Sequence, residues 1–137
     1  MPRFFNPPTI WKPFSAFSMG VVQGDGRIVH LKGQVPLDTD GQVVGPGDML
    51  VQVRKTLENI RDTLVHVGGG LGDILSLTHY VTDIRAFMMT RELRQEFFAE
   101  PYPVTTTVQV ASLFHRDILV EITAVAEIPR ERFKEPG

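Results

Sequence analysis

The chain has 137 residues, of which 42% are hydrophobic and 22% are charged, and this length and composition fit one globular domain spanning residues 1–137. Its 14 basic and 16 acidic side chains are interspersed and give a net charge of −2, so the clustered basic face of a nucleic-acid-binding protein is not expected. The absence of cysteine excludes disulfide bonds, thiolate catalysis and cysteine-based zinc sites.

The first twenty residues are rich in aromatic residues and proline, and are expected to form an extended arm with one short edge strand. The prolines interrupt any apolar run, so this segment does not fit a signal peptide. No later segment reaches the roughly 18 apolar residues that a membrane helix needs. The cytoplasm is therefore the expected compartment.

The first half of the chain predicts one strand and one long helix. Residues 27–34 follow a Gly-Asp-Gly turn, include β-branched residues and show an alternating pattern of side chains. This pattern predicts a strand with Ile28 and His30 on one face. Residues 48–67 repeat apolar side chains at spacings of three and four, which is typical of a helix. Asp48 can cap the start of this helix, and the following run of three glycines can end it.

The second half of the chain predicts three strands and a second helix. Residues 74–84 indicate a strand and residues 86–99 a helix. Residues 104–110 and 118–128 are two β-rich runs joined by a turn, which predicts a hairpin. The predicted order β-β-α-β-α-β-β indicates an α/β (α+β) fold, with both helices on one face of a mixed sheet.

The other face of this sheet would have no cover from the chain itself. In the last two strands the aliphatic sides, such as Val104 and Val108, are expected to pack under the helices. The mixed sides, which carry Thr105, Thr107 and Glu121, are then expected to face solvent or another subunit. We favour a homo-oligomer that buries this face, because apolar residues lie among the polar ones.

Four segments of the sequence match one known family: GRIVHLKGQVPLD, QVRKTLENIRDTLVHVGGGLGDILSLTHYVTDI, RQEFFAEPYPVTTTVQV and LVEITAVA. Through them the chain resembles the Rid family, also called YjgF or endoribonuclease L-PSP, over about residues 17–128. The resemblance implies a chorismate-mutase-like domain, a homotrimer and ligand clefts between neighbouring subunits. RidA-type members hydrolyse reactive enamines and imines, such as 2-aminoacrylate, to ketoacids and ammonia without a cofactor.

The resemblance also implies a catalytic position. The family motif P-A-R-S-x-V falls on residues 103–108, so Thr105 stands where an arginine holds the substrate carboxylate, and Thr107 is expected to line the same cleft. The family glutamate that positions water or shuttles its proton matches Glu121, while a second family glutamate becomes Thr123. Threonine lacks the charge and the bidentate geometry of arginine, which argues against ordinary 2-aminoacrylate deamination.

The other substrate-binding positions of the family are also altered. They are Lys32, Gly33 and Gln34 for the motif S-G-Q, Phe17 (or Phe14) for an N-terminal tyrosine, and Arg91 for an asparagine near the cleft. Lys32 and Arg91 are candidates for the missing cation, although each also fits an ordinary solvated charge. Arg94, on the same predicted helix, is expected to be such a solvated charge.

The resemblance, with these altered positions, leaves three functions to consider. The first is a cofactor-independent deaminase of a different enamine or imine, with an aminomuconate-type intermediate as one candidate. The second is a non-catalytic trimer that binds a small metabolite in the inter-subunit cleft. The third, a ribonuclease, is disfavoured by the acidic charge balance and the lack of a histidine pair. The four histidines show no metal-ligand spacing, so neither a metal nor a cofactor is expected.

Overall fold

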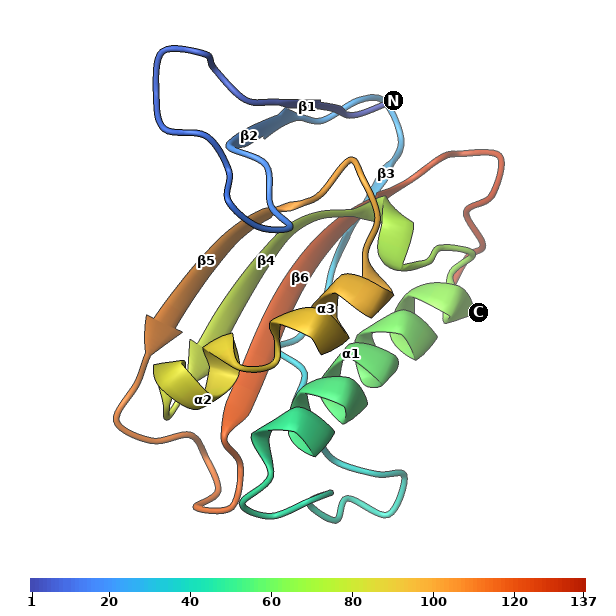
Figure 1. Cartoon of the computed structure of the whole chain (residues 1–137). Coiled ribbons are helices and arrows are strands. Elements are labelled where there is room, and N and C mark those ends of the chain that lie inside the picture. The colour runs from blue at the N-terminus through green and yellow to red at the C-terminus, as the bar shows by residue number, and fades with distance from the viewer.

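The computed structural model describes all of residues 1–137 and contains a four-stranded sheet with its helices on one face (Figure 1). The strands are ordered β3 (Arg27–His30), β6 (Val120–Ile128), β4 (Ile74–Val81) and β5 (Val104–Gln109). Strands β4 and β5 are parallel, whereas β6 is antiparallel to both of its neighbours. The predicted α/β fold with a mixed sheet is confirmed.

The N-terminal arm forms a separate two-stranded ribbon. Strand β1 (Arg3–Phe5) pairs antiparallel with β2 (Gly20–Val22), so the arm contains two paired strands instead of the one predicted. The loop between them returns to the main sheet, where Ser18 donates from its backbone N–H to the Pro103 carbonyl at 3.0 Å. The Ser18 hydroxyl also donates to the Tyr102 carbonyl at 2.6 Å. These bonds hold the loop beside the start of β5.

Helix α1 (Met49–His66) packs its apolar stripe on the sheet, as its periodicity predicts. Asp48 caps its start by accepting from the Val51 N–H at 3.1 Å. At its end, the Gly68 N–H donates to the Val65 carbonyl and the Gly69 N–H to the Leu64 carbonyl. These two bonds form a Schellman motif, which requires the positive φ of 85° that Gly68 adopts.

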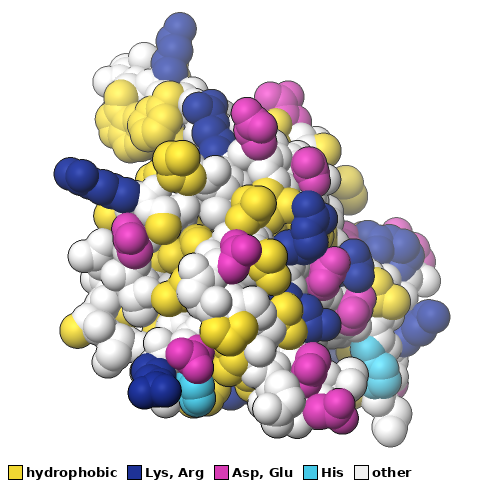
Figure 2. Space-filling view, turned by 60° about the horizontal axis from the view of Figure 1, so that its bottom comes forward, with side chains coloured by type: hydrophobic (Ala, Val, Ile, Leu, Met, Phe, Trp, Pro, Cys, Tyr) yellow, Lys and Arg dark blue, Asp and Glu magenta, His cyan; other side chains and the backbone are white.

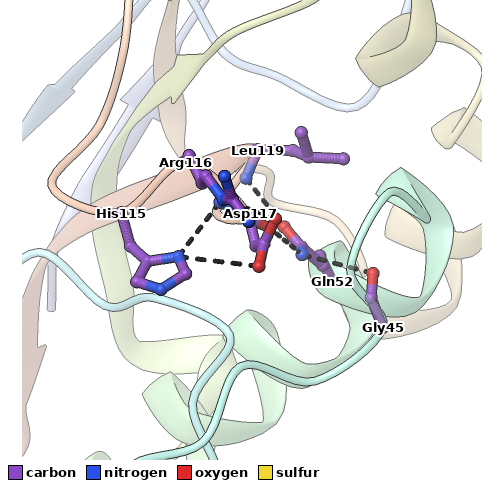
Figure 3. Close-up of polar contacts among 6 residues, drawn as sticks. All are labelled: Gly45, Gln52, His115, Arg116, Asp117 and Leu119. Carbon is purple, nitrogen blue, oxygen red and sulfur yellow. Dashed lines mark hydrogen bonds and ion pairs between the residues drawn. The ribbon is translucent and has the colours of Figure 1, made fainter.

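A fully buried polar side chain, Gln52, connects α1 to the loop before β6 (Figure 3). Its amide nitrogen donates to the Asp117 carbonyl at 2.7 Å and to the Gly45 carbonyl at 3.2 Å. Its amide oxygen accepts from the Leu119 N–H at 2.8 Å. Because each of these buried polar groups has a partner, the loop that leads into β6 is held in place without the energetic cost of unsatisfied hydrogen bonds.

The predicted second helix is divided into two short helices, α2 (Ile84–Met88) and α3 (Arg91–Phe97). The division falls at Thr90, whose buried hydroxyl donates to the Phe87 carbonyl at 2.7 Å. Such a bond from a threonine side chain competes with the helical hydrogen-bond pattern and ends α2. A single 3₁₀ turn, η1 (Leu71–Asp73), precedes β4. None of the helices combines the length and the apolar character needed to span a bilayer.

The predicted hairpin of the last two strands is wrong. Strand β4 lies between β5 and β6, and it pairs with both of them. The connection between β5 and β6 is ten residues long, from 110 to 119, which is enough chain to cross one intervening strand. The β-rich composition of both runs identifies them as strands but does not indicate which strand each one pairs with.

The expected facing of β5 is also wrong. The register aligns Thr105 with Leu77 and Thr107 with His79, and both of these β4 residues are buried on the helix side. Thr105 and Thr107 therefore face the helices, whereas Val104, Thr106 and Val108 lie on the open face. For β6 the expectation is confirmed, since its aliphatic side is fully buried in the core and Glu121 lies on the open face beside Tyr80.

Candidate functional site

A cavity of 430 Å³ opens between the N-terminal loop, helices α2 and α3, and strands β4 and β5. We call this cavity the arginine pocket. Its walls combine aromatic, cationic and hydroxyl side chains, mainly Trp11, Phe14, Phe17, His79, Met88, Arg91, Arg94, Thr105 and Thr107. The volume lies in the usual range of small-molecule sites.

Three aromatic rings form one wall of the arginine pocket. Trp11 stacks on Phe14 with ring centroids 5.8 Å apart, and Phe14 meets Phe17 edge-on at 5.3 Å. Trp11 and Phe14 are 60% and 74% exposed, which is unusual for rings of this size. Arg91 donates from Nη2 to the Phe14 carbonyl at 3.0 Å, so α3 holds this aromatic wall in place.

Arg94 forms the cationic side of the pocket together with Arg91. Its guanidinium carbon lies 4.3 Å from the centroid of the Phe87 ring, and its Nε donates to the Thr90 hydroxyl at 3.0 Å. Partial burial, and next the charge of Arg91, lower the pKa of Arg94. The expectation that Arg94 is an ordinary solvated charge is therefore wrong. The sequence signal for this position was its spacing of three residues from Arg91, which places both arginines on the same side of one helix.

A buried histidine forms the floor of the pocket. His79 is 4% exposed, and its Nδ1 lies 2.9 Å from the Thr107 hydroxyl. Burial, followed by the charge of Arg94, lowers the pKa of His79 to about 3. The ring is consequently neutral at pH 7 and fixes the Thr107 hydroxyl through a hydrogen bond. Sequence patterns gave no signal for this pair, because it depends on the parallel register of β4 and β5.

A second group of predicted residues, which we call the Glu121 cluster, comprises Lys32, Gly33, Gln34 and Glu121. Gln34 exchanges two backbone hydrogen bonds with Ile122, at 2.8 and 2.9 Å, which brings the segment beside β6. A side chain on Gly33 would overlap the Glu121 carboxylate, so glycine allows this carboxylate to lie against the backbone. Lys32, Gly33 and Gln34 also line an open cavity of 570 Å³ that reaches α1.

The predicted site residues thus fall into two groups within one chain. Phe17, Arg91, Thr105 and Thr107 meet in the arginine pocket. Glu121 lies on the opposite face of the sheet from Thr105 and Thr107. The fold and these groups define a small α/β domain with a ligand-sized pocket at one edge of its sheet.

Comparisons with known proteins agree with this class. The family model described as Endoribonuclease L-PSP matches residues 9–128. A RutC family protein of Pyrococcus abyssi is 30% identical over 115 residues, covering 84% of this chain and 88% of the relative. A protein of Escherichia coli K12, provisionally named reactive intermediate deaminase TdcF, is 36% identical over 105 residues, covering 74% of this chain and 79% of the relative.

Solved structures give the same result. YyfB of Yersinia pestis, a Rid family protein of unknown function, matches with a TM-score of 0.83 at 28% identity, covering 93% of this chain and 98% of that one. RidA of an Antarctic Psychrobacter matches with a TM-score of 0.68 at 27% identity, covering 85% and 92%. The chain belongs to the Rid family, also called YjgF or endoribonuclease L-PSP.

Proposed function

We propose that the protein is a cofactor-independent deaminase that hydrolyses an enamine or imine other than 2-aminoacrylate. Family membership and the name of the relative TdcF support the reaction class. The observation that carries the proposal is the pair Arg91 and Arg94 in the arginine pocket, next to Thr105. By the family resemblance Thr105 stands at the arginine position, and the cations on α3 would take over the binding of a carboxylate.

In this reaction an enamine first takes up a proton on carbon and loses one from nitrogen, and so becomes an imine. Glu121 accepts a proton from water while the water oxygen bonds to the imine carbon, and returns this proton to nitrogen, which gives a carbinolamine. The same carboxylate then carries the hydroxyl proton of the carbinolamine to nitrogen, the C–N bond breaks, and ammonia leaves behind a carbonyl group. Water supplies the oxygen atom and no group is oxidised or reduced, so the chemistry requires no cofactor.

The complete site in this proposal lies between two chains of a homotrimer. The open face of the sheet carries Glu121 and has no helix over it (Figure 1). A neighbouring chain that covers this face would bring its arginine pocket to the Glu121 cluster, as the family resemblance implies. The separation of the two groups within one chain supports this arrangement.

The ribonuclease activity suggested by the family's label has little support. The face drawn in Figure 2 carries Lys and Arg side chains interspersed with Asp and Glu, without a continuous basic stripe. A protein that tracks the phosphates of a nucleic acid usually presents such a stripe. The net charge of −2 is consistent with this distribution.

The proposal is tested by ammonia release from 2-aminoacrylate and from 2-aminomuconate, an aminomuconate-type substrate. We expect turnover of the larger substrate, loss of at least about a hundredfold in Glu121→Ala, and no loss in Glu131→Ala, a matched change at an exposed glutamate. Thr105→Arg should gain activity on 2-aminoacrylate. Absence of turnover of both substrates by the unmodified protein would contradict the proposal and favour the non-catalytic metabolite-binding trimer.

A further inference from the structure

The arginine pocket contains two positive charges that no carboxylate of the chain neutralises. None of the ion pairs in the structure includes Arg91 or Arg94. Both side chains line the same cavity, and the charge of Arg91 acts on Arg94 closely enough to lower its pKa. Two like charges that face one cavity repel each other, and an anion bound between them would remove this repulsion.

Both guanidinium groups retain donors for such an anion. Arg91 uses Nη2 for the Phe14 carbonyl, and Arg94 uses Nε for the Thr90 hydroxyl. Each guanidinium has five N–H donors, so several remain free on each. The bonds that are made hold the two groups in position, which lowers the entropic cost of binding an anion. Planar carboxylates match the fork of the guanidinium group.

The aromatic wall of the same cavity suits a flat apolar group. Trp11 and Phe14 stack with 27° between their ring planes, yet both rings remain more than half exposed. A planar apolar body placed against them would bury aromatic surface that is otherwise in contact with water. The cavity of 430 Å³ has room for a body of this kind beside the carboxylate.

We infer that the arginine pocket binds a carboxylate with a flat, unsaturated or aromatic body, with the carboxylate on Arg91 and Arg94 and the body against Trp11 and Phe14. The inference rests on the proposed function only in assigning this ligand as the substrate. It would also account for a threonine at position 105, where the family resemblance places an arginine, because the cations on α3 could bind the carboxylate in its place.

The tryptophan in the wall provides a direct measure of binding, because Trp11 is the only tryptophan of the chain. Its fluorescence is followed while benzoate, benzamide or acetate is added to the full-length protein. Benzoate should change the signal saturably, whereas benzamide, which has the body without the charge, should bind about tenfold more weakly. Acetate, which has the charge without the body, should also bind more weakly than benzoate.

Variants then separate the arginines from the rest of the pocket. Arg94→Gln should raise the dissociation constant of benzoate about tenfold while leaving that of benzamide unchanged. Arg91→Gln should weaken the binding of both ligands, because Arg91 also holds the aromatic wall through the Phe14 carbonyl. The matched control is Arg116→Gln, because the Arg116 side chain is 93% exposed and lies outside the pocket. Unchanged benzamide binding also shows that a variant still folds and keeps its aromatic wall.

Two results would overturn the inference: equal binding of benzoate and benzamide, or equal benzoate affinity in Arg94→Gln and Arg116→Gln. Either result would make the arginines purely structural groups that hold the N-terminal loop and Thr90. The outcome for the proposed deaminase is read separately, from ammonia release. A protein that binds benzoate through its arginines but hydrolyses neither enamine would uphold this inference and contradict the proposed reaction.

Discussion

At the scale of single residues, the floor of the arginine pocket shows how far an environment can change a side chain. His79 and Thr107 face the helices because parallel pairing places them side by side on that face of the sheet. In this position His79 contacts the Phe87 ring, with centroids 4.8 Å apart, and is close enough to Arg94 for that charge to lower its pKa. A neutral ring in this place keeps Thr107 oriented at any pH near neutrality.

The lowered pKa of His79 predicts a loss of stability in acid. Burial holds the pKa at about 3 in the folded chain, against 6.5 in the unfolded chain, so protons bind preferentially to the unfolded state between these values. The stability that the neutral His79 ring contributes is fully present above pH 6.5 and is lost as the pH drops toward 3. Lowering the pH from 7 to 5 should therefore reduce the free energy of unfolding by about 2 kcal/mol.

Urea denaturation at pH 7 and pH 5 measures this contribution. His79→Gln, which cannot titrate, should show a pH dependence smaller than that of the unmodified protein by about 2 kcal/mol. His66→Gln changes an exposed histidine at the end of α1 and should keep the original pH dependence. The same pH dependence in all three proteins would contradict the burial of a neutral His79.

At the scale of elements, local sequence signals were sufficient to predict the bounds of α1 but insufficient to predict how the strands pair. The start and end of α1 are set by Asp48 and Gly68, which act within a few residues, so the sequence predicts the helix almost to its ends. The pairing of β6 with β3 and β4 depends on contacts between distant segments and could not be read from alternation. The site shows the same limit, because His79 acquires its hydrogen-bond partner Thr107 from β5, a pairing that no local pattern indicates.

The end of α1 gives an element-scale prediction. Gly68→Ala should destabilise the protein by about 1–3 kcal/mol, because the position has a φ of 85° and a side chain there would overlap the Arg132 carbonyl. The Arg132 segment is packed against η1, with the guanidinium 2.6 Å from the Asp73 carboxylate. The new methyl group would therefore displace the C-terminal tail as well as strain the helix end.

Substitutions at two other glycines, measured by thermal or urea denaturation, separate the effect of backbone strain from that of the overlap with the tail. Gly41→Ala is also at positive φ but meets no neighbouring atom, so it should show only the backbone strain. Gly72→Ala has neither the positive φ nor a neighbour and should change stability little. If Gly68→Ala costs no more than Gly41→Ala, the contact with the tail does not matter to stability.

At the scale of the whole molecule, the open face of the sheet is also the surface that carries one of the two groups of site residues. Glu121 and Lys32 belong to a cluster that a single chain leaves facing outward, whereas Thr105 lies on the other side of the sheet. Under the proposed trimer both facts have one explanation, because each active site would take one group from each of two chains. Light scattering at micromolar concentration should then give about three times the 15.4 kDa mass of one chain.

A site shared between chains predicts complementation between two impaired variants. Glu121→Ala and Arg94→Gln each damage a different half of the proposed site, so trimers made of one variant contain no complete site. Unfolding the two together and refolding them at equal concentration should produce mixed trimers with about a quarter of the native sites, because each site needs an intact half from two particular neighbours. Ammonia release from 2-aminomuconate measures the recovery, and simple mixing without refolding serves as the control. If the refolded mixture has the trimer mass but no more activity than either variant alone, the two halves do not come from neighbouring chains.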